Sequence, residues 1–473
     1  MPDVENRLQK FDRLGQFEQT LLQILSIIYE PAHTTLVLNC LKRLELKGPR
    51  SNRPTTPLVN HYNSKLEEAG LLNNNRQCHP EIVETIARTA VKSGSFERFA
   101  AAVQKEAPAS YYYGKWSTRC WRAIRELRIG IYTQDFEIID QALNFLDSQC
   151  EDLPISLPPV VQIVNSPFEP QWFWALPPSF QFFLLNHIVL HAQRRLESFP
   201  EITAYINNPD NFAALDEDEY IPFQRLLLNL YLFQGDCDKA SDLLNSNVNI
   251  GLATGSRGTI AFLRGNYQEA AALFDEDLQT LGSINQTDIV AFVGIQGLFH
   301  VLSSAARGAG FLGHATRQIT IALSLFEESE EHQAYLYLHN LIESRLHQKN
   351  QPQEIALPES PSPSAVTLLF GALAQYWLAG ALETEMEEAV KDAYRRAAAH
   401  EYGLFTVLFS KLLKASASSV PDTPTDLSPN IEALHPFVDL IEPEEPWKRS
   451  LQALINISSS AVQEYKDQDR RLI

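Results

Sequence analysis

Few residues in this chain have the types and spacing that catalysis or cofactor binding requires. The run Gly308–Gly313 (GAGFLG) satisfies the G-x-G-x-x-G pattern of a dinucleotide-binding turn, and Glu327 or Glu328 lies near the distance expected for a ribose-binding acid. The preceding segment 293–306 has helical spacing, however, and no strand-rich βαβ unit surrounds the glycines. We therefore interpret them as a tight turn between two helices and expect no cofactor there.

Metal and nucleophile chemistry has little support. His187 and His191 are four residues apart on a predicted helix and share a face, but they lack the H-E-x-x-H carboxylate and have apolar neighbours, so a structural pair is expected. No G-x-x-x-x-G-K-[ST] phosphate loop and no G-x-S-x-G elbow occurs. The cysteines are widely spaced without a C-x-x-C pair and are expected to be reduced structural thiols: Cys40, Cys78, Cys120, Cys150 and Cys237. The sequence therefore predicts a chain that is not an enzyme and holds no metal.

Two charged segments allow a binding interpretation. Aromatic and basic residues alternate between Tyr111 and Arg128, which is compatible either with a surface for base stacking and phosphate contact or with packing at a domain junction. An acidic cluster formed by Glu383, Glu385, Glu387 and Glu388 is predicted to be a solvated helix face.

Composition and charge restrict the class of protein. The 473 residues allow two to four domains, and 45% hydrophobic against 21% charged residues excludes global disorder. The formal net charge is −19, yet residues 1–130 carry 19 Lys+Arg against 13 Asp+Glu, and the remainder carries 20 against 45. This split indicates an anionic partner for one end only. Because the amino end lacks a secretory signal and the longest apolar run, Val366–Leu382, is too short to span a membrane, we expect a cytoplasmic protein without membrane contact.

The first hundred residues predict a winged helix-turn-helix. Helical periodicity covers residues 17–28, 34–44 and 57–69; Thr55 or Thr56 is placed to cap the third helix, Pro57 suits its first turn, and Gly70 suits its end. A polar turn rich in asparagine follows, as expected for a short hairpin. The phrase KLEEAGLL resembles the end of a recognition helix that continues into the first strand of a wing.

This arrangement nominates seven side chains for duplex DNA contact: Arg50, Arg53, Asn60, His61, Asn63, Lys65 and Arg76. Many winged helices dock proteins instead, and Glu67 and Glu68 on the same helix would oppose a phosphate backbone. Both alternatives remain open at this level.

Internal similarity indicates helical repeats further along. The pattern Gly258-x6-Gly265-x-Tyr267-x2-Ala270-x3-Phe274-x3-Leu278 matches the helix–turn–helix spacing of a tetratricopeptide-like unit. The same frame recurs 30 residues earlier at Leu228, Tyr231, Gly235, Cys237, Ala240 and Leu244, and weaker copies cover 125–146 and 389–412. Stacked units form a solenoid whose groove suits a protein or peptide partner.

The order of these modules resembles the amino-terminal region of large bacterial helicase-like ATPases of the Swi/Snf class. The resemblance rests on the winged-helix start, the degenerate repeats, the phrase SPFEPQWFWALPPSFQ between them and a terminal W-K-x-S-L-x-A-L…DRRLI helix. It implies a regulatory or substrate-docking region of such a motor, whose own ATP-binding motifs do not occur in this sequence.

The expected fold is therefore mainly α, with a winged helix over 1–107, tetratricopeptide-like helical repeats over 108–355, and a second repeat segment with a terminal helix over 356–473. The favoured function is a non-catalytic interaction module that uses the solenoid for protein docking and the winged helix for DNA or partner contact. The alternative is a free-standing transcription regulator whose solenoid senses a peptide or protein. An enzyme using Gly308–Gly313 ranks last.

Overall fold

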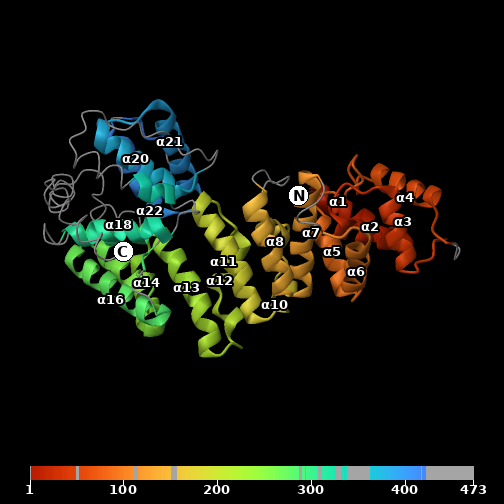
Figure 1. The fold of residues 1–473 in the computed structure, drawn as a ribbon, viewed down its shortest axis with the longest axis horizontal. Helices are drawn as coiled ribbons and strands as arrows, with labels where there is room; N and C mark the ends of the chain where they lie inside the picture. Colours follow the sequence, from red (N-terminus) through yellow and green to blue (C-terminus); the bar gives the residue numbers. More distant parts are fainter. Residues whose placement is uncertain are drawn as a thin grey trace. The chain divides into compact units, whose positions relative to one another are not determined.

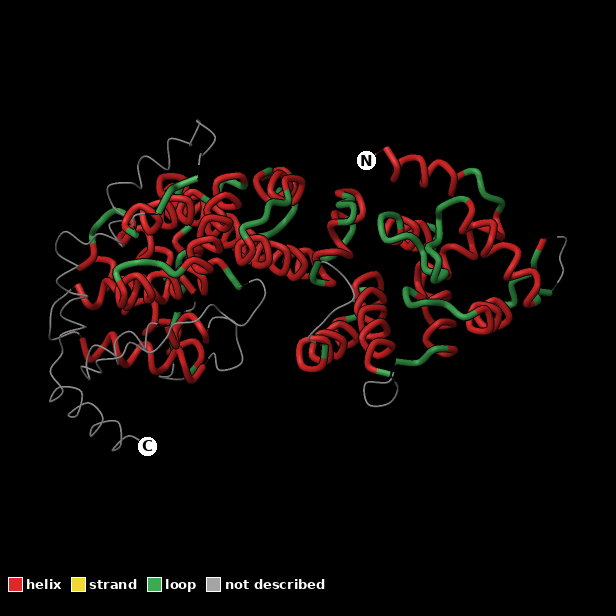
Figure 2. Tube along the Cα trace, turned by 90° about the horizontal axis from the view of Figure 1, so that it is seen from above, coloured by secondary structure: helices red, strands yellow, loops and turns green. Residues whose placement is uncertain are grey.

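The structure is a computed structural model that describes residues 2–49, 53–109, 115–150, 157–286, 290–292, 294–306, 312–325, 332–337, 363–416 and 418–421. These residues form helices joined by loops, and no strand longer than a single bridge occurs among them (Figures 1 and 2). The prediction of a mainly α protein is confirmed. In the same ranges, no helix has the length and apolar character needed to cross a membrane.

The chain divides into two compact units, residues 1–188 and 189–473. The division falls within the helix α11 (Pro178–Arg195). The predicted boundary at residue 107 therefore lies inside the first unit, and the predicted boundary at residue 355 lies outside the described residues.

The amino-terminal part of the first unit contains the three predicted helices. They correspond to the second, third and fourth of six: α1 (Pro2–Asp12), α2 (Gln16–Ile28), α3 (Thr34–Arg43), α4 (Thr56–Glu68), α5 (Val83–Lys92) and α6 (Phe96–Glu106). Thr55 precedes α4 with an extended backbone but makes no capping bond from its side chain, and Gly70 adopts a φ of 74° after the helix, which favours glycine. Beyond it, Leu72 and Cys78 form one antiparallel bridge at the position predicted for a hairpin.

The rest of the first unit consists of α7 (Trp116–Thr133), α8 (Phe136–Gln149), α9 (Pro159–Asn165), α10 (Pro170–Trp174) and the start of α11. Helix α7 packs against α2, α6, α8 and α9, so it belongs to the same core as the first six helices. The hairpin of α7 and α8 brings Cys120 and Cys150 to a Cα–Cα distance of 6.2 Å, and they form a disulfide. The expectation of five reduced thiols is wrong for this pair, because residues 30 apart meet across the hairpin; Cys40, Cys78 and Cys237 are free.

The second unit is also built from helices. After the end of α11 they are α12 (Pro200–Asn207), η2 (Pro209–Phe212), α13 (Glu217–Gln234), α14 (Cys237–Ser246), η3 (Val248–Ile250), α15 (Ser256–Leu263), α16 (Tyr267–Asn285), α17 (Gly294–Ala306), α18 (Leu312–Leu325), α20 (Ala365–Ala379), α21 (Thr384–Ala399) and α22 (Gly403–Ala415). One apolar core joins α15–α17 to α20–α22, and its members include the fully buried Phe299, Leu369 and Phe405.

Two helix pairs cross closely, and one crossing, between α15 and α16, lies at residues of the predicted pattern. A Cβ atom on Gly258 of α15 would lie 2.7 Å from Cγ of Phe274 in α16, so only glycine fits without displacing that ring. Ala270 and Phe274 have no exposed surface. In the α7–α8 pair, a Cβ on Gly130 would lie 2.8 Å from Cγ1 of Ile139. Both helix–turn–helix pairs therefore depend on a glycine at the crossing.

Candidate nucleic-acid or partner interface

Helix α4 presents one face to the core and the opposite face to solvent. Val59, Asn63 and Leu66 are buried, which is the spacing of a single helical stripe. The exposed face carries His61, Ser64, Lys65 and Glu68. Asn63 is 1% exposed, so it cannot contact nucleic acid, and its prediction as a contact residue is wrong. Its amide sits between two apolar residues of the inward stripe, and that spacing alone was sufficient to place it inside.

Lys65 is exposed but already paired. Its Nζ donates to the carboxylate of Glu18 in α2, and Gly15 N donates to the other oxygen of that carboxylate at 2.7 Å. Burial alone would raise the pKa of Glu18, but the hydrogen bonds from Lys65 and Gly15 outweigh burial and hold the pKa below its usual range. The same hydrogen bond raises the pKa of Lys65. At neutral pH both groups are charged, and the carboxylate of Glu18 offsets the positive charge of Lys65.

Arg76 and Asn60 also make contacts within the unit. Arg76 Nη1 donates to Oγ1 of Thr34 at 2.6 Å, and Thr34 Oγ1 in turn donates to Oδ1 of Asn60 at 2.7 Å. Arg76 Nε lies 3.8 Å from a carboxylate oxygen of Glu67. This chain of contacts joins the residue of the predicted wing to α3 and α4, so Nη1 of Arg76 and Oδ1 of Asn60 are engaged within the unit.

The remaining candidates differ in exposure. Arg53 is exposed before α4 and has no hydrogen-bond or ion-pair partner among the described residues, and His61 is exposed with its ring 5.1 Å from the ring of Tyr62. Arg50 lies outside the described residues. Of the six predicted contact residues that the structure describes, Arg53 and His61 are therefore exposed without an ion-pair partner, and Lys65 is available only in competition with Glu18.

The positive charge of the amino-terminal region is mostly used inside the unit. Its cations pair with carboxylates or donate to carbonyl oxygens in the cases of Arg7, Lys10, Arg43, Lys65, Arg76, Arg88, Lys92, Arg98, Arg122, Arg125 and Arg128. Lys42, Lys47 and Arg53, by contrast, are exposed near the loop between α3 and α4 and contact no charged partner within the described ranges. Within the described ranges, the excess of basic residues thus does not form a continuous phosphate-binding surface on α4.

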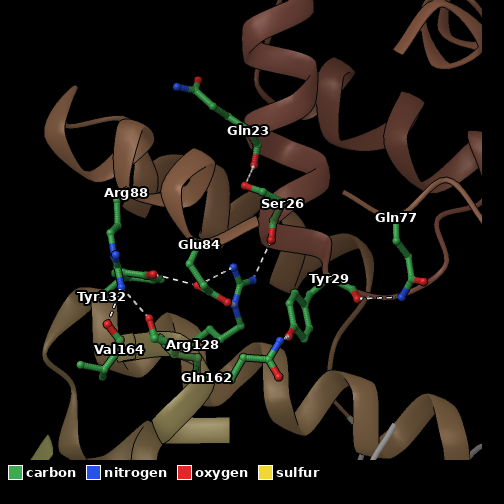
Figure 3. A network of polar contacts seen from close by, with 11 residues as sticks. Gln23, Ser26, Tyr29, Gln77, Glu84, Arg88, Arg128, Tyr132, Gln162 and Val164 are labelled. Carbon is green, nitrogen blue, oxygen red and sulfur yellow. Dashed lines mark hydrogen bonds and ion pairs between the residues drawn. The ribbon is translucent and has the colours of Figure 1, made fainter. Parts of the chain in front are cut away.

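A buried polar network connects helices of the first unit (Figure 3). Arg128 Nε lies 3.0 Å from Oε1 of Glu84 and Nη1 donates to the Ser26 carbonyl at 2.7 Å, while the guanidinium lies 4.1 Å from the ring centre of Tyr29. The Tyr132 hydroxyl donates to Glu84 at 2.8 Å. Burial, and then the charge of Glu84, raise the pKa of Tyr132, so this hydroxyl keeps its proton at neutral pH. The network links α2, α5 and α7.

A second buried arginine fixes the segment after α8. Arg88 of α5 donates to the carbonyl oxygens of Ile163, Val164 and Pro167 at 2.6, 3.1 and 2.5 Å. Its guanidinium also lies 4.6 Å from the ring centre of Trp172. Arg88 therefore holds the first part of the phrase SPFEPQWFWALPPSFQ, from Pro167 to Trp172, against α5.

The aromatic and basic stretch 111–128 is not a stacking surface in its described part. Arg125 and Arg128 are buried, Arg122 pairs with Glu30 at 3.1 Å, and the ring of Trp121 lies 5.6 Å from that of Tyr29. These contacts match the alternative of packing between segments. Tyr111, Tyr112 and Tyr113 lie outside the described residues.

The other chemical candidates take structural positions. The ring of His187 lies 4.7 Å from that of Phe183, and His191 Nε2 lies 3.2 Å from Glu197. No group of three or more potential ligands that could hold a metal occurs in the ranges that the structure describes. Gly308 and Gly310 lie outside those ranges. In the acidic cluster, Glu387 and Glu388 pair with Lys391 on α21.

Comparison with known proteins gives no assignment. No family model, no curated protein and no solved structure matches the chain. A proposal for the function therefore depends on the geometry above.

Proposed function

We propose that the chain is a non-catalytic protein-docking module, in which a winged-helix-like head precedes an α-solenoid of tetratricopeptide-like pairs. The observation that carries the proposal is the internal use of the cations on and around α4. Lys65 pairs with Glu18, and Arg76 lies beside Glu67, so the helix in the recognition position lacks the free charges that hold a phosphate backbone. The glycine-dependent crossings at Gly258 and Gly130 support the repeat architecture.

The partner that best fits the order of modules is a nucleic-acid-dependent helicase-like ATPase. The resemblance to the amino-terminal region of Swi/Snf-class motors supports this choice, with the motor acting in the same or in a separate chain. In this role the head and the solenoid regulate the motor or bring its substrate to it.

Salt dependence of DNA binding separates docking from DNA recognition. For each neutralised phosphate, the binding constant for duplex DNA falls by about 0.9 log units per tenfold increase in salt concentration. Near α4, the described cations without an ion-pair partner are Lys42, Lys47 and Arg53, and the sequence adds Arg50, so DNA contact through this helix should give a log–log slope no steeper than about −4. Lys65→Ala should leave this slope unchanged, because Lys65 is paired. Tight binding of one operator sequence with a much steeper slope would contradict the proposal and favour the transcription regulator.

The docking role itself is tested with the motor. A Swi/Snf-class ATPase encoded in the same genome should co-migrate with the full chain in size-exclusion chromatography and change its DNA-stimulated ATP turnover when the chain is added. If the chain neither co-migrates with the ATPase nor changes its turnover, the assignment to a motor is contradicted.

A further inference from the structure

A groove opens beside the exposed face of α4. It has a volume of about 600 Å³ and lies between the start of α2, the loop that follows α3, and α4. Its volume falls within the range of sites that accept a small ligand or a few side chains of a peptide, about 300–1,000 Å³.

The walls of the groove combine apolar surface with positive charge. Phe17 and Tyr62 line it with their rings 5.2 Å apart at an interplanar angle of 63°, and Leu46 and Pro49 add aliphatic surface. None of these four side chains is buried, so their apolar atoms are accessible to an occupant.

Among the described residues that line the groove, the charged ones are two lysines and one carboxylate: Lys47, Lys65 and Glu18. Glu18 is bonded to Lys65 and to the Gly15 backbone, so it does not offer a free negative charge. Lys47 is exposed and contacts no charged partner in the described part of the chain. The groove therefore carries a net positive charge beside an aromatic wall.

We propose that this groove binds a short acidic segment of a protein partner that carries one aromatic or aliphatic anchor. The anchor lies against Phe17 and Tyr62, and flanking carboxylates contact Lys47 and the outer side of Lys65. Nucleic acid fits less well, since the described lining supplies lysines rather than guanidinium groups for phosphate contact, and Lys65 is already paired with Glu18. The inference rests on the proposed docking function and names the chemistry of the segment that docks.

The test uses the full chain and a fluorescently labelled synthetic peptide in which glutamates flank a single tryptophan. Fluorescence anisotropy should show saturable binding at low salt. Two comparison peptides, one with lysine in place of glutamate and one with alanine in place of tryptophan, should bind at least about tenfold more weakly, a difference of about 1.4 kcal/mol.

Variants locate the binding site. Lys47→Glu should weaken peptide binding about tenfold or more, because it reverses the unpaired charge; it should not affect folding, since Lys47 is exposed. Lys105→Glu makes the same charge change on the exposed surface of α6, outside the groove lining, and should leave affinity unchanged. Tyr62→Leu keeps an apolar side chain but removes the ring. It should weaken binding of the tryptophan peptide more than binding of the alanine peptide.

The outcomes separate this inference from the proposed function. Equal affinity of wild type and Lys47→Glu for the acidic peptide would overturn the groove assignment, as would displacement of the peptide by single-stranded DNA at lower concentration than by unlabelled peptide. Motor binding that survives in Lys47→Glu would likewise overturn the groove while the docking function stands. If peptide binding depends on Lys47 but the chain does not bind the ATPase, the groove assignment is supported and the ATPase is rejected as the partner.

Discussion

Arg128 and Glu84, 44 residues apart in sequence, form a buried ion pair with side chains that are 2% and 0% exposed. Glu84 lies on α5, within the winged-helix domain predicted over 1–107, whereas Arg128 lies on α7, within the repeats predicted over 108–355. The pair therefore connects the two predicted domains within the first compact unit.

Removing one charge of this pair should destabilise the first unit strongly. Glu84→Gln leaves the Arg128 guanidinium buried without a counterion, which typically costs about 3–5 kcal/mol. Glu81→Gln removes a half-exposed carboxylate that pairs with Arg7, and should cost less than about 1 kcal/mol. Urea denaturation followed by circular dichroism measures both, and equal midpoints for the two variants would contradict the interpretation.

Truncation at residue 107 should abolish cooperative folding of the amino-terminal region. A chain that ends there lacks Arg128 and the three carbonyl groups that accept from Arg88, so two buried charged groups lose their partners. The matched chain 1–188 retains them and should unfold in one sharp transition. A sharp urea transition for 1–107, at the same midpoint, would show that the winged-helix region is independent after all.

Overpacking the α15–α16 crossing should destabilise the second unit. Ala270 has no exposed surface, so Ala270→Leu should cost about 1–3 kcal/mol. Gln268→Leu introduces the same side chain at an exposed position of the same helix and should change stability by no more than about 0.5 kcal/mol. Thermal unfolding compares them; an unchanged transition for Ala270→Leu would mean that the repeat register is wrong.

Protonation of His79 should weaken the first unit at mildly acidic pH. Burial, and then the charge of Arg7 at 2.7 Å, lower the pKa of His79 below the usual value of about 6.5, despite the opposing effect of Glu81. The unfolded chain therefore binds a proton at His79 more readily than the folded chain. The stability that neutral His79 contributes is complete above about pH 6.5 and is lost as the pH falls through the folded-state pKa. When the pH is lowered from about 7.5 to 5.5, the urea denaturation midpoint of the wild type should fall by more than that of His79→Gln. Parallel pH dependence in both proteins would contradict this role.

The sequence was sufficient for the features that depend on neighbours along the chain. Periodicity located α2, α3 and α4, and the spacing of Gly258, Ala270 and Phe274 identified a close crossing, because both helices of a pair lie in one short segment. It also contained the stripe that places Asn63 inside, since Val59 and Leu66 lie one turn away on either side.

Contacts between distant segments were beyond such reasoning. Lys65 meets a carboxylate 47 residues away, and Arg76 meets a hydroxyl 42 residues away, so a count of charges along the chain overstates the charge that is free. The groove beside α4 likewise combines three segments, and nothing in the local pattern of any one of them indicates a cavity.

Arg88 has a consequence for how mutations in this protein would be interpreted. Helix α9 is only seven residues long, and isolated helices of that length are not stable in water. The carbonyl groups of Ile163 and Val164 near its end accept hydrogen bonds from Arg88, which lies 75 residues before Ile163. The order of residues 159–172 therefore depends partly on a side chain outside this segment. In a saturation mutagenesis experiment, a substitution at Arg88 should therefore reproduce the defects of many substitutions in α9 and α10, and a second mutation there should add little to the first.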